Sequence, residues 1–180
     1  MNKAAVLAII LLAATAARAE PYPEEDSRDY TQEWGQAFYR NRLVEATGAS
    51  EKLREVFRLA QDQSHGITVS LSAGKFYTVL GSCTRFCSAL TVAIKRADGS
   101  TAAQSSDGLS RAMPFLEWQA ESSGRYTIET TADQCTAVRC KAGVQLFESD
   151  KPIDSKTALE RPSAWENSHQ TSVCPVPKAA

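Results

Sequence analysis

The sequence has few of the residues on which common catalytic sites depend. Histidine occurs only at His65 and His169, which stand too far apart to form a paired metal-ligand motif. A serine hydrolase needs a histidine base beside its nucleophile, and no G-x-S-x-G elbow occurs. An H-E-x-x-H motif, a glycine-rich phosphate loop and a dinucleotide-binding fingerprint are also missing. The sequence therefore predicts a protein that is not an enzyme.

The chain also lacks a strong net charge and a second long apolar run. Its 20 Lys and Arg residues nearly balance 21 Asp and Glu residues, which leaves a net charge of −1. Proteins that bind nucleic acid or anionic lipid typically carry a cluster of basic residues, and none occurs here. No stretch after residue 19 supplies the roughly 20 apolar residues of a membrane-spanning helix. We expect no nucleic-acid partner, no integral membrane segment in the exported protein, and no cofactor.

The N-terminus has the three parts of a cleavable signal peptide. Lys3 supplies a positive charge, residues 4–14 are apolar, and Ala17-Arg18-Ala19 matches the small-residue cleavage site. A retained membrane anchor is the alternative, but the apolar run ends at Thr15, before it reaches the length of a transmembrane helix. We interpret residues 1–19 as a signal peptide, so that the mature protein is periplasmic or secreted.

All five cysteines follow the signal peptide, and export would place them where disulfides form and persist. Their C-x3-C and C-x4-C spacings differ from the C-x2-C spacing of zinc ribbons. Neighbours in sequence can meet whatever the fold, which favours the bridges Cys83–Cys87 and Cys135–Cys140. Cys174 is then a free or intermolecular thiol. Alternatively, Cys174 ties the C-terminal tail to the domain and leaves another cysteine single.

The first part of the mature chain predicts a leader and two helices. Residues 20–28 are rich in proline and acidic side chains, which predicts a flexible leader. Aromatic residues recur every four positions after Asp29, as on one face of an amphipathic helix, and Gly48 suits its end. The same helical spacing continues beyond Ser50 at Leu53, Val56, Phe57 and Ala60. The sequence thus predicts a helical pair over residues 29–63.

From His65 onward the periodicity becomes that of strands. Ile67–Leu71 and Leu90–Ile94 alternate apolar with polar residues, and Asp98-Gly99 is a hairpin signal. Further short runs such as Met113–Gln119 follow at intervals of roughly 8–12 residues. This pattern predicts a mainly β, antiparallel β-sandwich domain over residues 66–148, preceded by the two N-terminal α-helices. Residues 149–180 contain several prolines and predict a C-terminal tail.

Three motifs within this region resemble the bacterial pre-peptidase C-terminal type of domain. They are Ala73-Gly74-Lys75-Phe76-Tyr77, the strand Leu90–Ile94 followed by Asp98-Gly99-Ser100, and Ser123-Gly124-Arg125-Tyr126. The resemblance covers about residues 66–147 and implies a jelly-roll-like β-sandwich with a non-catalytic binding, secretion or accessory role. A similar group of domains has acidic residues at the first cysteine loop that would suit calcium. The Cys83–Cys87 loop has no carboxylate, so we expect no metal there.

The function that the sequence favours is a non-enzymatic binding or accessory module for a protein or a cell-envelope component. The candidate binding loop is the possible disulfide ring that carries Arg85 and Phe86. A constrained loop loses little entropy on binding, and both residue types are enriched at interface hot spots. The competing interpretation is that Phe86 packs into the edge of the sandwich.

Two other functions remain open on the sequence. Periplasmic lysozyme inhibitors are small exported β-sandwiches with a similar S-G-x-Y strand, and one inserts a loop into a glycosidase cleft. The other class is an enzyme, either a small secreted hydrolase or a thiol oxidoreductase. The strand and turn positions of Glu117, Glu121 and Glu129 favour solvated carboxylates over a catalytic pair. The C-x3-C spacing likewise differs from the C-x2-C of common redox motifs.

Overall fold

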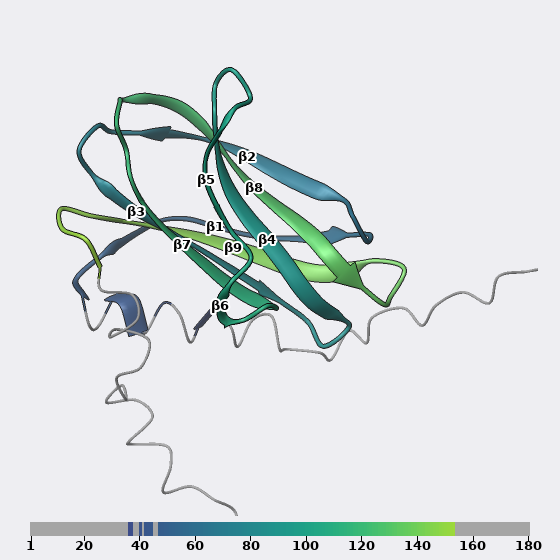
Figure 1. Ribbon diagram of the computed structural model, residues 1–180. Coiled ribbons are helices and arrows are strands. Elements are labelled where there is room, and N and C mark those ends of the chain that lie inside the picture. Colours follow the sequence, from purple (N-terminus) through teal and green to yellow (C-terminus); the bar gives the residue numbers. More distant parts are fainter. Residues whose placement is uncertain (1–35, 38–39, 41, 45–46, 154–180) are drawn as a thin grey trace, which may run out of the picture.

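The computed structural model describes residues 36–37, 40, 42–44 and 47–153. They form a sandwich of two antiparallel sheets (Figure 1). The five-stranded sheet has the order β1-β9-β3-β7-β6, and the four-stranded sheet has the order β2-β8-β4-β5. The strands are β1 (Ser50–Leu59), β2 (Ser64–Leu71), β3 (Phe76–Cys83), β4 (Cys87–Arg96), β5 (Thr101–Ser105), β6 (Gly108–Ser110), β7 (Met113–Gln119), β8 (Gly124–Cys135) and β9 (Cys140–Ser149).

The strands pair in a nested order. β1 pairs with β9, β2 with β8, β3 with β7 and β4 with β5, all antiparallel. β9 also pairs with β3, and β8 with β4, which completes the two sheets. Successive strands from β1 to β4 therefore alternate between the two sheets, and the first strand, β1, pairs with the last strand, β9.

The main core lies between the sheets. Val79 and Leu146 from the five-stranded sheet meet Val92, Ile94 and Ile128 from the four-stranded sheet, and all are almost fully buried. Burial of each such side chain contributes roughly 1.5–3 kcal/mol relative to its exposure. The alternation read from Leu90–Ile94 is confirmed, because Val92 and Ile94 face this core and Leu90 is buried in the neighbouring cluster around the cysteines.

The second helix expected after Ser50 is wrong, because Ser50–Leu59 forms the edge strand β1. Leu53 and Phe57 are four residues apart, a spacing that fits a helical face and also fits alternate positions of a strand. Val56, which the helical interpretation placed on the apolar face, points outward and is 43% exposed. The sandwich therefore begins at Ser50, ahead of the boundary expected at residue 66.

A β-bulge and a core-facing glutamate interrupt the strand periodicity of β1. Glu55 is opposite the core residue Val144 and takes a position that a strand pattern would fill with an apolar residue. The bulge between Glu51 and Leu53 puts Glu51 opposite Phe147, on the other face of the sheet. Arg54 and Gln145 both donate hydrogen bonds to the Glu51 carboxylate, and this pairing leaves the pKa of Glu51 below its ordinary value although burial alone would raise it. The carboxylate of Glu51 is thus a partly buried polar group that has hydrogen-bond partners within the protein.

The described residues between 36 and 47 are helical, whereas the start of the first predicted helix lies outside the described residues. Gly48 follows with a φ of 68°, and its N–H donates to the carbonyl of Val44 at 3.1 Å, which is typical of a helix C-terminus. Leu43 is fully buried and packs against Leu80 and Phe147. β3 and β9 are consequently buried on both faces, as central strands of the five-stranded sheet.

A buried tyrosine closes one end of the sandwich. The hydroxyl of Tyr77 donates to Oε2 of Glu148 at 2.8 Å and accepts the N–H of Ser72 at 2.9 Å. Burial alone would raise the pKa of Glu148, but hydrogen bonds from Tyr77 and Lys52 outweigh it and leave the pKa below its ordinary value. Burial also raises the pKa of Tyr77, so that its hydroxyl remains a donor at neutral pH.

We expect Tyr77→Phe to lower the free energy of unfolding at pH 7 by about 1–3 kcal/mol, because it leaves a half-buried carboxylate and a backbone N–H without their partner. The lowered pKa of Glu148 means that its contribution is present above the ordinary value of 4.5 and is lost as the pH falls through the folded-state value. Urea unfolding of both proteins between pH 7 and pH 3 should therefore show the difference shrinking in acid. Equal stability at pH 7, or a difference that grows in acid, would contradict this role.

Candidate functional site

Both disulfides lie at one end of the sandwich. Cys83–Cys87 joins the end of β3 to the start of β4, and Cys135–Cys140 joins the end of β8 to the start of β9. Cys87 and Cys135 are opposite each other on the paired strands β4 and β8, so the bridges are neighbours. These are the two pairs that sequence spacing favours, whereas Cys174 lies outside the described residues.

Three loops meet around these bridges, and we call them together the disulfide end: residues 84–86, 111–112 and 136–139. The carbonyl of Phe86 accepts hydrogen bonds from the N–H and the hydroxyl of Thr136, at 2.8 and 3.1 Å. Phe86, Ala112 and Ala137 all pack against the cluster that contains the four bonded cysteines. The loops are therefore fixed to one another by hydrogen bonds and by apolar contacts.

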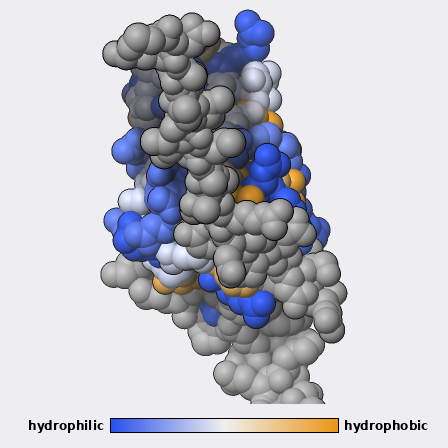
Figure 2. Space-filling view, turned by 90° about the vertical axis from the view of Figure 1, so that its right-hand side faces the viewer, coloured by the Kyte–Doolittle hydropathy of each residue, from blue (hydrophilic) through white to orange (hydrophobic). Residues whose placement is uncertain are grey.

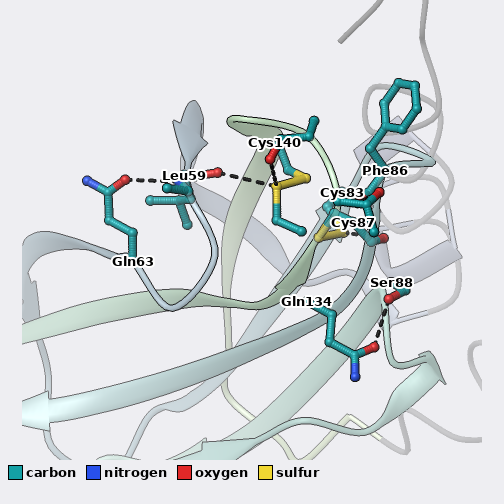
Figure 3. The surroundings of a disulfide bond; sticks show 12 residues. Leu59, Gln63, Cys83, Phe86, Cys87, Ser88, Gln134 and Cys140 are labelled. Atoms are coloured by element: carbon teal, nitrogen blue, oxygen red, sulfur yellow. Dashed lines mark hydrogen bonds between the residues drawn. A yellow bond between two sulfur atoms is a disulfide. The ribbon is translucent and has the colours of Figure 1, made fainter. Parts of the chain in front are cut away.

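The two candidate binding residues lie together at this end. The guanidinium carbon of Arg85 is 4.8 Å from the centroid of the Phe86 ring, which is a cation–π contact. Arg85 is exposed and Phe86 is half-buried. Phe86 packs against the outside of the cysteine cluster. Its ring points away from the Cys83–Cys87 bridge (Figure 3). Each interpretation of Phe86 thus holds in part, since the side chain is anchored and also partly accessible.

The loops that carry residues 84–86 and 136–139 are on the right of Figure 1, and Figure 2 views the molecule from that side. Among the coloured residues of this view, most are hydrophilic, with small hydrophobic patches between them. Val138 is 51% exposed beside the exposed Arg139. The disulfide end therefore presents apolar and basic side chains side by side.

The S-G-x-Y motif lies at the opposite end, where the loop between β7 and β8 leads into the first residues of β8. The hydroxyl of Tyr126 donates to the carbonyl of Ser122 at 2.9 Å and lies 3.0 Å from the Ser122 hydroxyl. The Ser123 hydroxyl accepts the N–H of Ala73 at 2.9 Å, which ties the loop to the turn between β2 and β3. The motif thus folds back on its own strand and forms a fixed loop.

A shallow cavity of about 320 Å³ separates this loop from the turn between β4 and β5. We call it the arginine notch, because Arg96 and Arg125 line it together with Ser122, Ser123 and Asp98. Arg96 forms an ion pair with Glu121 at 3.3 Å and donates to the carbonyl of Thr101 at 3.2 Å. These bonds hold one guanidinium across the notch, while the neighbouring Arg125 is exposed.

Asp98 keeps a negative charge at the rim of the notch. Its carboxylate accepts the N–H of Ser100 at 2.8 Å, and hydrogen bonds from Ser100 hold the pKa of Asp98 below its ordinary value. The notch is therefore lined by two arginines, one aspartate and several hydroxyls, and one of its arginines is paired with Glu121. It suits a polar partner that supplies carboxylates for the arginines.

The histidine that sequence analysis weighed as a catalytic base occupies a structural position. Nε2 of His65 is 2.8 Å from Oε1 of Glu55, and its ring centroid is 4.4 Å from that of Phe57. Since His65 lies on β2 and both partners lie on β1, the contact joins the two sheets at their edge. His169 lies outside the described residues.

The three candidate carboxylates are spread over the molecule. Glu121 pairs with Arg96, Glu129 pairs with Lys95 at 3.3 Å, and Glu117 is half-buried on β7. Within the described part of the chain, no group of three or more His, Cys, Asp and Glu residues is placed to hold a metal ion. The same residues include no helix that is long and apolar enough to cross a membrane.

Sequence analysis missed the arginine notch, although it singled out the motif that forms one side of it. Arg125 is the variable position of S-G-x-Y, and Arg96 precedes the Asp98-Gly99 turn. Their proximity depends on the pairing of β4 with β8, in which Arg96 is opposite Tyr126. Local spacing carries no information on that pairing.

No protein-family model matches the chain, and no curated protein matches it either. Among solved structures, the chain is similar to a periplasmic lysozyme inhibitor of g-type lysozyme from Aeromonas hydrophila. The two chains are 14% identical, with a TM-score of 0.42. The match covers 58% of this chain and 90% of the inhibitor.

We expect the double variant Cys83→Ser/Cys87→Ser to fold but to lose about 2 kcal/mol of stability. The bridge closes a ring of about five residues, and small rings remove little entropy from the unfolded chain. Urea unfolding of the oxidised protein measures the loss, and the matched variant Cys135→Ser/Cys140→Ser should lose a similar amount. A variant that cannot fold, or one with unchanged stability, would contradict the interpretation that each bridge only holds a local loop in place.

Proposed function

We propose that this protein is an exported, non-enzymatic binding module whose partner is another protein. The arginine notch carries the proposal, because internal bonds hold the guanidinium of Arg96 and the hydroxyl groups in place. Arg96 is fixed by Glu121 and Thr101, and the serines are fixed through Tyr126 and Ala73. Groups that are already ordered lose little conformational entropy on binding, so more of their interaction energy contributes to affinity.

A lysozyme inhibitor is the more specific candidate that the notch favours. Glycosidases use a pair of Asp or Glu carboxylates that flank the scissile bond. Guanidinium and hydroxyl groups on a fixed loop complement such a pair, since hydrogen bonds between arginine and carboxylate are charge-assisted. The S-G-x-Y strand, which is similar to that of periplasmic lysozyme inhibitors, supplies Arg125 and Tyr126 at this position. Lysozyme is thus the first glycosidase to test.

The bonded cysteines count against the thiol oxidoreductase alternative. Redox catalysis needs an accessible, low-pKa thiol. Cys83, Cys87, Cys135 and Cys140 are each at most 6% exposed and are bonded in pairs. The position of His65 in an edge contact similarly gives a hydrolase no described base beside a serine nucleophile.

The proposal includes export and a jelly-roll-like fold. Two disulfides favour an oxidising compartment, which supports a periplasmic or secreted location. The nested pairing of β1 with β9, β2 with β8, β3 with β7 and β4 with β5 supports the jelly-roll arrangement. The signal peptide and the resemblance to pre-peptidase C-terminal domains stay predictions.

For the lysozyme hypothesis, the mature protein should inhibit at least one enzyme of a panel that includes a g-type lysozyme, measured by clearing of a bacterial cell-wall suspension. Arg125→Ala should weaken inhibition about tenfold or more, since a hydrogen bond to a charged group contributes about 1.5–3 kcal/mol. Arg85→Ala, at the other end of the sandwich, is the matched control and should inhibit as the wild type does. Absence of inhibition at micromolar concentration would rule out lysozyme as the partner.

The broader proposal is tested by capture of partners from an envelope extract on the oxidised mature protein. We expect mass spectrometry to identify a protein retained by wild type and by Arg85→Ala, and lost with Arg96→Ala/Arg125→Ala. Equal retention by the notch variant would assign binding to another surface. Recovery of nothing above background would overturn the protein-binding proposal.

A further inference from the structure

The disulfide end is a second surface with the features of an interaction site. Arg85, Arg111 and Arg139 are exposed there, one on each of its three loops. We propose that this end docks an acidic segment of a partner protein, one that combines carboxylates with an apolar side chain. The proposal concerns a surface distinct from the arginine notch and does not depend on lysozyme inhibition.

The backbone brings the three arginines to neighbouring positions. The N–H of Leu90 on β4 donates to the carbonyl of Arg111 at 2.8 Å, which places this loop beside the strand that begins at Cys87. The hydrogen bonds from Thr136 to Phe86 join the loop of Arg85 to the loop of Arg139. Each loop is anchored by an alanine or phenylalanine in the cysteine cluster, so the three exposed arginines belong to loops that are held in place.

The balance of charge at this end is positive, although the protein as a whole is slightly negative. Neither residues 84–86 nor residues 136–139 include a carboxylate. The acidic residues on adjoining loops are Asp62 and Asp107, and both are exposed. Three arginines against two aspartates leave a local excess that attracts an acidic segment, while the net charge of −1 opposes general binding of acidic peptides.

Apolar groups lie among these charges. Val138 is 51% exposed and Leu109, on the short strand β6, is 45% exposed. Phe86 adds a half-buried aromatic face that is already covered on one side by Arg85. An interface core needs such apolar anchors, and arginine and aromatic residues are enriched in it.

The number and type of basic residues favour a protein over a membrane or a nucleic acid. Surfaces that bind anionic lipid typically cluster about four to eight Lys and Arg residues, more than the three on these loops. A guanidinium pairs with a carboxylate through two parallel hydrogen bonds and stacks on aromatic rings, as Arg85 does on Phe86. Stacking restrains Arg85 before the partner arrives, which lowers the entropic cost of binding.

The distance between the two surfaces lets them act separately. Cys87 and Arg96 are the first and last residues of β4, and ten residues of strand span about 30 Å. Arg96 lines the arginine notch, whereas Cys87 lies in the disulfide end. A partner of ordinary size bound at one end therefore leaves the other end accessible.

Fluorescence anisotropy of the full mature protein tests this docking surface, with a labelled peptide of about ten residues built from glutamate and leucine as the probe. We expect Arg85→Gln/Arg111→Gln/Arg139→Gln to bind the probe at least about tenfold more weakly, and higher salt to weaken wild-type binding. Arg96→Gln/Arg125→Gln carries the matched loss of charge at the other end and should bind as the wild type does. Arg139→Glu, a single reversal at an exposed loop position, repeats the test if the triple variant does not fold.

Lysozyme inhibition by the same variants separates the two proposals, because the triple variant at the disulfide end should inhibit as well as the wild type. The docking proposal is overturned if the acidic probe does not bind, if a peptide with lysine in place of glutamate binds equally, or if the notch variant loses as much affinity. Binding of vesicles rich in phosphatidylglycerol without binding of the peptide would also overturn it, in favour of a lipid surface.

Discussion

The pairing of β9 with both β1 and β3 is the constraint on which the rest of the structure depends. β9 lies between the first strand and the third, so the five-stranded sheet cannot form until the end of the described chain has returned to its beginning. Contacts of such long sequence separation form slowly and contribute only when the whole sheet is assembled. Leu146 and Phe147 show the consequence, since adjacent residues of one strand are buried on opposite faces.

The core residues lie in the middle of the molecule, and the two candidate surfaces lie at its two ends. The end closed by Tyr77 holds the arginine notch, and the other end holds both disulfides. Loops on a rigid scaffold are where binding residues concentrate, because their side chains can change without disturbing the core. The bridges add local fixation where the loops 84–86 and 136–139 leave the sheets.

The sequence was most informative where a strand has a polar and an apolar side. Met113–Gln119 was expected with the bounds that the structure has, and Leu90–Ile94 lies inside β4. It was misleading at Ser50–Leu59, because Leu53 and Phe57 fit two periodicities and the bulge between Glu51 and Leu53 interrupts the alternation. Short-range pairs such as Cys83–Cys87 could be proposed from their spacing, since residues so close in sequence can meet in almost any fold.

The candidate sites were less predictable than the strands, for the same physical reason. Arg85 and Phe86 are adjacent in sequence and could be singled out together, whereas the notch needs Arg96 and Arg125 to meet across the pairing of β4 with β8. A binding surface assembled from separate loops is a property of the sheet register, and a shift by one residue would turn its side chains to the other face. The interactions that hold the register, from the interior of the sandwich to the Tyr77–Glu148 hydrogen bond, therefore also determine which charged side chains lie together at each end.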